Sequence, residues 1–354
     1  MRRKLLIAAL CGASMGAYAI TSPVASNTTI TGTDSFTGLL AVNSNVILTI
    51  GESGGATGSL TLTNTGGYPL VNNGRIVVNA GSSLAVNRTD AVKWAYASYS
   101  GSMDIYGSVT TSYGSTATDV FGYNLAVGAG KTLNVFSGGT LTYGNGSLAV
   151  QGGTANFYAG SLTKVDKLVI NGSNGKIVVG ADGVLTNTSG GTISELTVGS
   201  NQSNTRLDVS ATTNFSIGNF TVQQGTSFGV ILPSASGAIF TLGKFSLNPT
   251  LTYLGTETFT LEDFANDIFK ISDSSNLNII DKSILEVTTQ GKTNTFTLIA
   301  KDSEGQTITL AENQTWEISE SGFLNIVTVV PEPAEWAAIF GAAALALAFV
   351  RRRK

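Results

Sequence analysis

The sequence predicts an all-β protein of three parts: a right-handed parallel β-helix, a small antiparallel β module with one short helix, and a C-terminal transmembrane helix. Stretches in which apolar and polar residues alternate recur between glycine-rich turns, which is the pattern of half-buried strands. Most acidic residues follow residue 250, where this texture ends. An uncharged segment between prolines and arginines closes the chain of 354 residues.

Residues 1–19 have the features of a signal peptide: a basic start, a short apolar run, and the small-residue site Ala17-Tyr18-Ala19. We therefore expect signal peptidase to cut after Ala19 and the remainder of the chain to be exported. The alternative is a lipoprotein acylated at Cys11, although Leu10 stands where such a site needs a small residue.

The residue types that the chain lacks exclude much chemistry. There is no histidine, and the only cysteine, Cys11, leaves with the signal peptide. A Ser-His-Asp or Cys-His nucleophile, an imidazole metal site and a disulfide are therefore excluded from the mature chain. We expect no cofactor, no metal site and no enzymatic activity.

Charge is distributed unevenly along the mature chain. Residues 20–250 carry nine acidic and nine basic side chains, whereas residues 251–330 carry twelve acidic side chains against four lysines. This shift in composition indicates two regions. Neither region is basic enough to favour nucleic acid as a partner.

Residues 20–240 are predicted to form a β-solenoid rich in Gly, Asn, Ser and Thr. In residues 125–162, apolar pairs recur every seven or eight positions, and the glycines between them permit turns with positive φ. Three strands per coil would give about 20–25 residues per coil and about eight to ten coils. Because the period drifts, a β-sandwich or an up-and-down sheet is the alternative. The texture resembles the β-strand repeats of autotransporter and adhesin-like surface proteins, which implies display, adhesion or biofilm scaffolding.

Residues 241–330 are predicted to form an acidic antiparallel module that caps the solenoid. Apolar residues at helical spacing between Leu261 and Phe269 predict one helix, TLEDFANDIFKI, with Thr260 and Asp263 as a capping box. Strands are expected after it at SILEVTT, TFTLIAK, QTITLA, TWEIS and FLNIVTVV. Such a module would cover the open strand edge that a solenoid leaves at its end.

Three groups of residues are candidate ligand sites. An aromatic series could stack on glycans, although core and loop packing is the favoured interpretation: Trp94, Tyr96, Tyr99, Tyr106, Tyr113 and Tyr123. Asp166 and Asp182, with Lys164 and Lys167, are the nearest approach to a polysaccharide lyase or hydrolase site, which is the alternative to a structural role. Thr61-Leu62-Thr63 and Thr140-Leu141-Thr142 would suit an ice-binding face, but two examples do not establish a regular array.

Residues 331–354 consist of a motif, an uncharged segment and a basic cluster. The residues that define them are Pro331, Glu332 and Pro333 in the motif, Trp336, Ala337, Gly341 and Val350 in the segment, and Arg351, Arg352 and Arg353 in the cluster. As a helix, the segment from Trp336 to Val350 spans about 22 Å, against about 30 Å for the hydrocarbon core of a bilayer. It predicts a short membrane helix, and a buried C-terminal helix is the alternative.

This arrangement resembles a PEP-CTERM sorting signal. The resemblance implies recognition by an exosortase, a membrane-embedded cysteine protease of Gram-negative bacteria, and cleavage near the Pro-Glu-Pro motif. Since both ends of the chain carry their positive charges on the inner side, residues 20–330 are expected outside the inner membrane. We expect transient anchoring in the inner membrane and then delivery to the cell surface or extracellular matrix, where extracellular polysaccharide is a possible partner.

Overall fold

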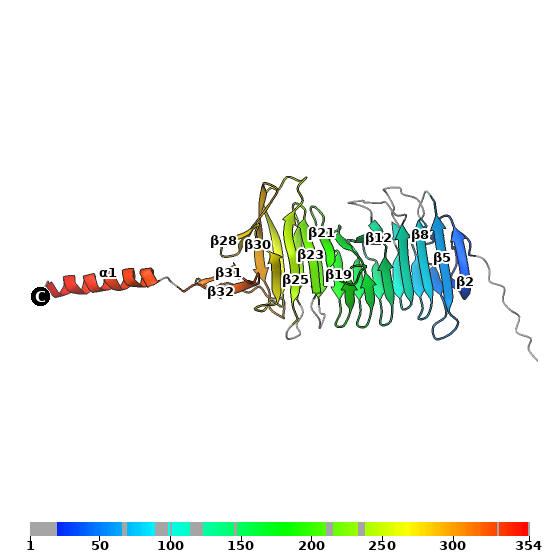
Figure 1. Ribbon diagram of the computed structural model, residues 1–354, viewed down its shortest axis with the longest axis horizontal. Helices are drawn as coiled ribbons and strands as arrows, with labels where there is room; N and C mark the ends of the chain where they lie inside the picture. Colours follow the sequence, from blue (N-terminus) through cyan, green and yellow to red (C-terminus); the bar gives the residue numbers. More distant parts are fainter. Residues whose placement is uncertain are drawn as a thin grey trace, which may run out of the picture. The chain divides into compact units, whose positions relative to one another are not determined.

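The computed structural model describes residues 20–65, 69–88, 98–99, 101–113, 123–144, 147–209, 215–232, 238–330 and 333–352. These residues form mostly parallel β-sheets and one helix, α1 (Pro333–Arg352), as Figure 1 shows. The predicted all-β class is therefore confirmed. The chain divides into two compact units, residues 1–194 and 195–354, which we describe separately.

The first unit is built from coils, each of three consecutive strands. One sheet contains β1 (Thr28–Ile30), β4 (Ile47–Ile50), β7 (Arg75–Val78), β10 (Ser102–Ile105), β13 (Thr132–Val135), β16 (Thr154–Phe157) and β19 (Lys176–Val179). A second contains β2 (Gly32–Thr37), β5 (Gly58–Asn64), β8 (Ser83–Arg88), β11 (Ser108–Tyr113), β14 (Thr140–Tyr143), β17 (Leu162–Lys164) and β20 (Val184–Thr186). The third side consists of β3 (Leu40–Val42), β6 (Leu70–Asn72) and β9 (Ser98–Tyr99), and then β12 (Tyr123–Gly128), β15 (Ser147–Gln151) and β18 (Lys167–Ile170).

Consecutive coils of the first unit pair in parallel and in register. Thr132, Thr154 and Lys176 occupy the same position on three successive coils and are 22 residues apart, within the predicted range. The earlier coils are longer, since the paired residues Ile47 and Arg75 are 28 residues apart. The drift of the period in the sequence therefore reflects turns of different length between strands that stay in register.

Alternation along each strand builds the core of the first unit. One interior column, at most 3% exposed, consists of Leu48, Ile76, Met103, Leu133, Ala155 and Ile177. The tight turn at Gly107 shows why glycine is needed between strands, because a Cβ there would lie 2.3 Å from the carbonyl oxygen of Ser82. Close stacking of coils thus restricts the residue types at the corners.

The second unit places strands alternately in two sheets. One sheet contains β21 (Ile193–Val198), β23 (Phe215–Val222), β25 (Phe240–Leu247) and β27 (Phe269–Asp273). The other contains β22 (Thr205–Val209), β24 (Ser227–Ile231), β26 (Thr256–Glu262), β30 (Lys292–Ala300), β29 (Ile284–Thr289) and β28 (Leu277–Asp281), of which only the last two pairings are antiparallel. A separate antiparallel hairpin consists of β31 (Gln314–Ile318) and β32 (Leu324–Thr328).

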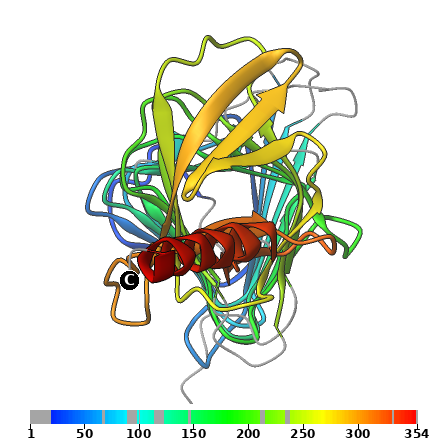
Figure 2. The same ribbon diagram turned by 90° about the vertical axis from the view of Figure 1, so that its left-hand side faces the viewer.

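Buried phenylalanines fill the interior of the second unit. Phe220 stacks on Phe245 with ring centroids 4.8 Å apart, and Phe245 meets Phe296 at 4.9 Å. All three side chains are at most 2% exposed. The end-on view in Figure 2 shows the strands of this unit, coloured green to orange, around the interior that these rings occupy.

The predicted helix at TLEDFANDIFKI is wrong. Leu261 lies on β26 and Phe269 on β27, and both face the interior. The segment between them contains Asp263 and Asp267, whose φ values of 53° and 59° are incompatible with a right-handed helix. Pairing with strands that are distant in sequence outweighs the local helical spacing of the apolar residues.

The strands expected after residue 280 are mostly found. SILEVTT, TFTLIAK, TWEIS and FLNIVTVV correspond to β29, β30, β31 and β32, whereas QTITLA forms no strand. The sequence did not predict β28, which is the edge strand of its sheet. Parallel pairing also continues beyond residue 240, through β27 and through the pairing of β26 with β30.

The hairpin β31–β32 contacts the last strand of the neighbouring sheet in the same unit. The backbone N–H of Ile271 on β27 donates to the carbonyl oxygen of Gly322 at 2.7 Å, and Lys270 forms a bridge with Phe323. Trp316 on β31 is 2% exposed and lies edge-on to Phe264, with ring centroids 4.8 Å apart. The hairpin therefore occupies part of the strand edge that β27 would otherwise present to solvent.

Candidate functional site

The C-terminal residues of the predicted sorting signal lie on α1. This helix has 20 residues, five more than the predicted segment, and corresponds to a length of about 30 Å. It begins at Pro333, a position where proline is tolerated because its missing N–H has no partner within the helix. Ala337 and Gly341 are exposed, and Arg351 and Arg352 are exposed in the last turn.

Several predicted residues fall outside what the structure describes. These are Ala17 and Ala19 of the signal peptide, Pro331 and Glu332 of the motif, and Arg353. The backbone of Trp336 and of Val350 lies within α1. Within the described part of the chain, no helix combines the length and the hydropathy that a membrane crossing requires.

Asp166 and Asp182 lie at different corners of the first unit. Asp166 follows β17, and its Oδ1 accepts hydrogen bonds of 2.9 Å from both the N–H and the hydroxyl of Thr188. Asp182 occupies a turn between β19 and β20 with a φ of 58°. The two carboxyl groups therefore do not flank one bond of a substrate, as a glycosidase pair must.

Hydroxyl side chains gather on the outer face of the second sheet of the first unit. The Thr-x-Thr segments at Thr61 and Thr140 both lie on this sheet, on β5 and β14. Of the eight positions in register with their threonines on the neighbouring strands, four are also serine or threonine, namely Ser35, Thr37, Ser108 and Thr110. We define the hydroxyl face as Thr33, Ser35, Thr37, Ser59, Thr61, Thr63, Ser83, Ser108, Thr110, Ser112, Thr140 and Thr142.

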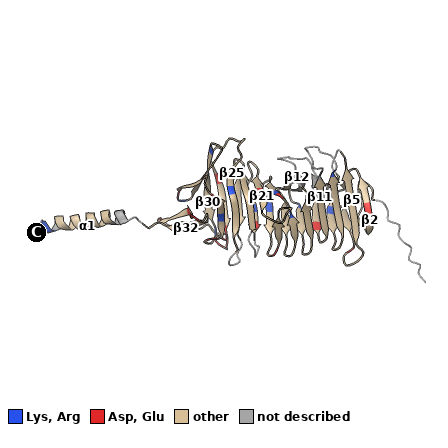
Figure 3. Cartoon of the chain, viewed as in Figure 1, with Lys and Arg blue, Asp and Glu red and all other residues tan. Residues whose placement is uncertain are grey.

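The hydroxyl face carries no charge, and it is interrupted on β8, where Ala85 and Asn87 take the outward positions beside Thr61 and Thr63. Neighbouring strands lie about 4.8 Å apart, and alternate residues along a strand lie about 6.6 Å apart, so the hydroxyl groups form a grid. Where two of them meet, as at Ser59 and Ser83, the oxygen atoms are 2.9 Å apart. Lys164 on the next strand, β17, is in register with Thr142 and places a positive charge just outside the face. Figure 3 shows how few charged residues the strands β5 and β11 carry.

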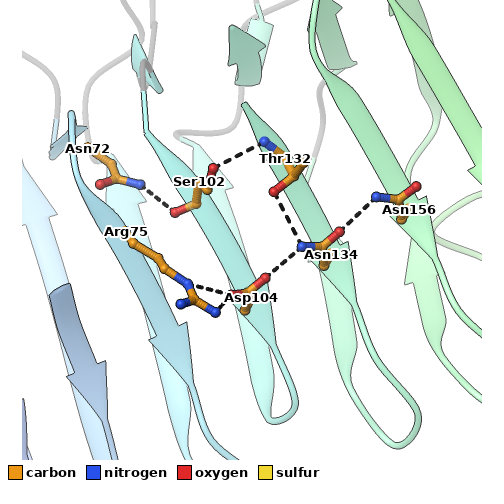
Figure 4. A network of polar contacts seen from close by, with 7 residues as sticks. All are labelled: Asn72, Arg75, Ser102, Asp104, Thr132, Asn134 and Asn156. Atoms are coloured by element: carbon orange, nitrogen blue, oxygen red, sulfur yellow. Dashed lines mark hydrogen bonds and ion pairs between the residues drawn. The ribbon is translucent and has the colours of Figure 1, made fainter. Parts of the chain in front are cut away.

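A ladder of polar side chains runs across the first sheet of the same unit (Figure 4). Asp104 is 3% exposed, and its Oδ2 accepts from Nε of Arg75 at 2.7 Å. Its Oδ1 accepts from Nδ2 of Asn134 at 2.7 Å, and Oδ1 of Asn134 in turn accepts from Nδ2 of Asn156 at 2.8 Å. The ladder thus joins four successive coils, those of β7, β10, β13 and β16.

Beside this ladder, three aromatic rings are stacked at the ends of β10, β13 and β16. Tyr106 and Phe136 have centroids 4.3 Å apart, Phe136 and Tyr158 have centroids 4.9 Å apart, and the ring planes are within 4° of parallel. Of the predicted aromatic series, Tyr106 alone has a side chain that the structure describes; Trp94 and Tyr96 lie outside the described residues. We call Tyr106, Phe136 and Tyr158 the aromatic stack.

The second unit contains a buried carboxyl group and a tyrosine with raised pKa values. Glu257 is 3% exposed; its Oε1 accepts from the N–H of Gly225 at 3.0 Å, and its Oε2 has no hydrogen-bond partner. Burial raises the pKa of this carboxyl. Burial also raises the pKa of Tyr253 to about 12, and its hydroxyl donates to the carbonyl oxygen of Val222 at 2.6 Å.

A set of ion pairs lies on the outer face of the same unit. Glu262 pairs through Oε2 with Nη2 of Arg206 at 2.7 Å and through Oε1 with Nζ of Lys301 at 3.7 Å. Arg206 also contacts Asp208 at 3.2 Å. Among the described residues, no three Asp, Glu, His or Cys side chains lie close enough to hold a metal ion.

Sequence reasoning missed the aromatic stack, although the signal is present. Met103-Asp-Ile-Tyr106, Leu133-Asn-Val-Phe136 and Ala155-Asn-Phe-Tyr158 share one pattern: an interior residue, a polar ladder residue, an interior residue and an aromatic ring. Alignment of the chain on its own coil repeat would have revealed this column.

Comparisons with protein families, with characterised proteins and with solved structures find no match to this chain.

Proposed function

We propose that this chain is an exported structural or adhesin-like protein of the cell surface or extracellular matrix, sorted by an exosortase through its C-terminal tail. The observation that carries the proposal is the placement of α1. It begins at the last residue of the Pro-Glu-Pro motif and ends in Arg351 and Arg352. A Pro-Glu-Pro motif at the start of a helix with a basic end suits a protease that cuts beside a membrane.

The finer architecture that we propose is a right-handed parallel β-helix, with the hairpin β31–β32 and the strands β28–β30 as its C-terminal cap. Support comes from the three-strand coil of the first unit and from the strong preference for right-handed connections between parallel strands. The bond between Ile271 and Gly322 supports the capping role. Such a solenoid offers long flat faces for contact with a matrix.

The proposed partners follow the path of the chain. Signal peptidase acts at Ala19, an exosortase-type protease acts near Pro331-Glu332-Pro333, and extracellular polysaccharide is met after delivery. Transient anchoring requires that α1 hold the chain in the membrane only until the motif is cut and the exported part is released. Its alanine-rich sequence suits this role, because alanine contributes little hydrophobic transfer energy compared with leucine or phenylalanine.

The test is to replace the motif in the cells that produce the protein. Substituting Pro331, Glu332 and Pro333 by alanine should leave the uncut chain in the inner-membrane fraction. The matched control is Glu335→Ala, an acidic residue just outside the motif, which should be processed normally. Normal cutting and surface delivery of the triple variant would contradict the proposal.

A second candidate function, ice binding, is favoured by the hydroxyl face. The two Thr-x-Thr segments of the sequence prove to lie on one sheet, within a grid of hydroxyl groups that spans five strands. Hydroxyl groups fixed at regular spacing on a rigid sheet can order water at that spacing, and charged groups would disturb such an arrangement.

This candidate is tested by ice recrystallisation in the presence of the purified full chain. Thr61→Lys and Thr110→Lys should each weaken inhibition, whereas Thr154→Lys, on a different sheet, should not. Failure of the unmodified chain to inhibit recrystallisation would rule ice binding out.

A further inference from the structure

The aromatic stack leaves two ring faces uncovered by its own members. Because the rings are parallel and 4.3 and 4.9 Å apart, Phe136 is covered on both faces by its neighbours. Only the outer faces of Tyr106 and Tyr158 remain. These two side chains are 37% and 43% exposed, respectively. Any flat ligand that stacks on this column must therefore use one of its ends.

The two ends of the stack differ. On the coil after Tyr158, the corresponding position is Gly180: the N–H of Tyr158 donates to Val135, and the N–H of Gly180 donates to Phe157 in the same way. On the coil before Tyr106, the corresponding position is Asn79, whose side chain donates to the carbonyl oxygen of Gly51. At this position of the adjoining coil, an asparagine side chain lies next to Tyr106, whereas the residue next to Tyr158 is a glycine and has no side chain.

The polar ladder ends at Asn156, on the same coil as Tyr158, and its last side chain is open toward the same adjoining coil. Nδ2 of Asn156 donates to Asn134, and no residue that the structure describes donates to its Oδ1. On the next coil, Asn156 is in register with Val178, whose side chain cannot donate a hydrogen bond. The side-chain carbonyl of Asn156 is therefore available to a donor that lies over Val178. Asn156 and Tyr158 are alternate residues, so their positions are about 6.6 Å apart along the strand.

We propose that Tyr158, Asn156 and Gly180 form a subsite for one sugar ring of a neutral extracellular polysaccharide. A pyranose has an apolar C–H face and hydroxyl groups at its rim. The C–H face would stack on the outer face of Tyr158 in the space that Gly180 leaves, and a rim hydroxyl would donate to Oδ1 of Asn156. None of the three residues carries a charge, which matches a neutral sugar.

This inference deepens the proposed function and rests on it for its biological setting, since it names the partner that a surface protein would meet. Its chemistry does not depend on sorting. Binding is measured with purified protein, and processing is measured in cells, so that failure of one leaves the other standing.

The test is affinity electrophoresis of the full chain, kept soluble in a mild detergent, through gels that contain dextran, laminarin, galactomannan or xylan. At least one of these polysaccharides should retard the protein. Tyr158→Ala should weaken that retardation at least about tenfold, whereas Tyr158→Phe should retain it, because stacking needs the ring and not the hydroxyl.

Two further variants separate a binding role from a structural one. Gly180→Phe should abolish retardation, since a fourth ring would cover Tyr158 while leaving the stack intact. Its φ lies outside the left-handed region, and the nearest atom to a Cβ would be the Phe157 carbonyl oxygen at 3.2 Å. Tyr106→Ala, at the other end of the stack, should bind as the unmodified chain does. The proposal is overturned if no polysaccharide retards the protein, if Gly180→Phe binds normally, or if Tyr106→Ala loses as much as Tyr158→Ala.

Discussion

Asn134 donates a hydrogen bond of 2.7 Å to the buried carboxylate of Asp104 on the preceding coil, and accepts one of 2.8 Å from Asn156 on the next. One amide thus links three coils. The carboxylate cannot turn to water, because Asp104 is almost completely buried. Polar side chains therefore supplement the backbone pairing that holds successive coils together.

Asn134→Ala should lower the free energy of unfolding by about 1–3 kcal/mol, because it leaves one oxygen of a buried carboxylate without its donor. Chemical denaturation monitored by circular dichroism measures the change. The control is Thr154→Ala, which alters an outward residue of the neighbouring strand in the same sheet. Equal stability of the two variants would show that the ladder does not stabilise the coils.

Glu257 should make stability depend on pH. Because burial raises the pKa of this carboxyl in the folded state, its contribution is largest below the ordinary glutamate pKa and is lost as the pH rises through the folded value. Glu257→Gln should therefore gain stability relative to the unmodified chain at about pH 8 but not at about pH 4. Thermal unfolding at the two pH values measures this difference.

The matched control for Glu257 is Glu262→Gln. The Glu262 carboxylate pairs with Arg206 and Lys301, so its neutralisation should lower the free energy of unfolding by about 1 kcal/mol at neutral pH. We therefore expect Glu257→Gln and Glu262→Gln to change the free energy of unfolding in opposite directions. A loss of stability in both at about pH 8 would contradict the assignment of Glu257 as a buried, unfavourably charged group.

Removal of the cap should produce association as well as instability. Trp316→Ala should loosen the hairpin from β27 and cost about 3–5 kcal/mol, and the exposed strand edge should then recruit other chains. Light scattering after mild heating measures the association. The control is Phe245→Ala, in the interior of the same unit, which should lower the free energy of unfolding by a similar amount. In this variant, association should not begin at a lower temperature relative to the temperature of unfolding.

The sequence predicts the strands well where alternation and glycine turns coincide. Leu133, Val135, Leu141 and Tyr143 all face the interior, as their period-two spacing requires. The register between coils is not visible in any one repeat, because turns of different length separate the strands. The hydroxyl face and the aromatic stack depend on that register, so they become evident only when the coils are aligned with one another.

The error at residues 260–271 has a different origin. Leu261 and Phe269 fit a helical face by spacing, yet each belongs to a strand that pairs with partners many residues away, such as Val230 and Phe240. Short apolar runs do not distinguish a buried strand from a short helix. The two aspartates with positive φ between the strands gave no clear local signal, since aspartate occurs in both helix caps and turns.

The most direct measurement of the central claim is the intact mass of the protein recovered from the surface of the producing cells. Sorting through the tail predicts a chain that begins at Ile20 and ends close to Pro333, without the residues of α1. Recovery of a surface protein that still carries Arg351-Arg352-Arg353-Lys354 would contradict it.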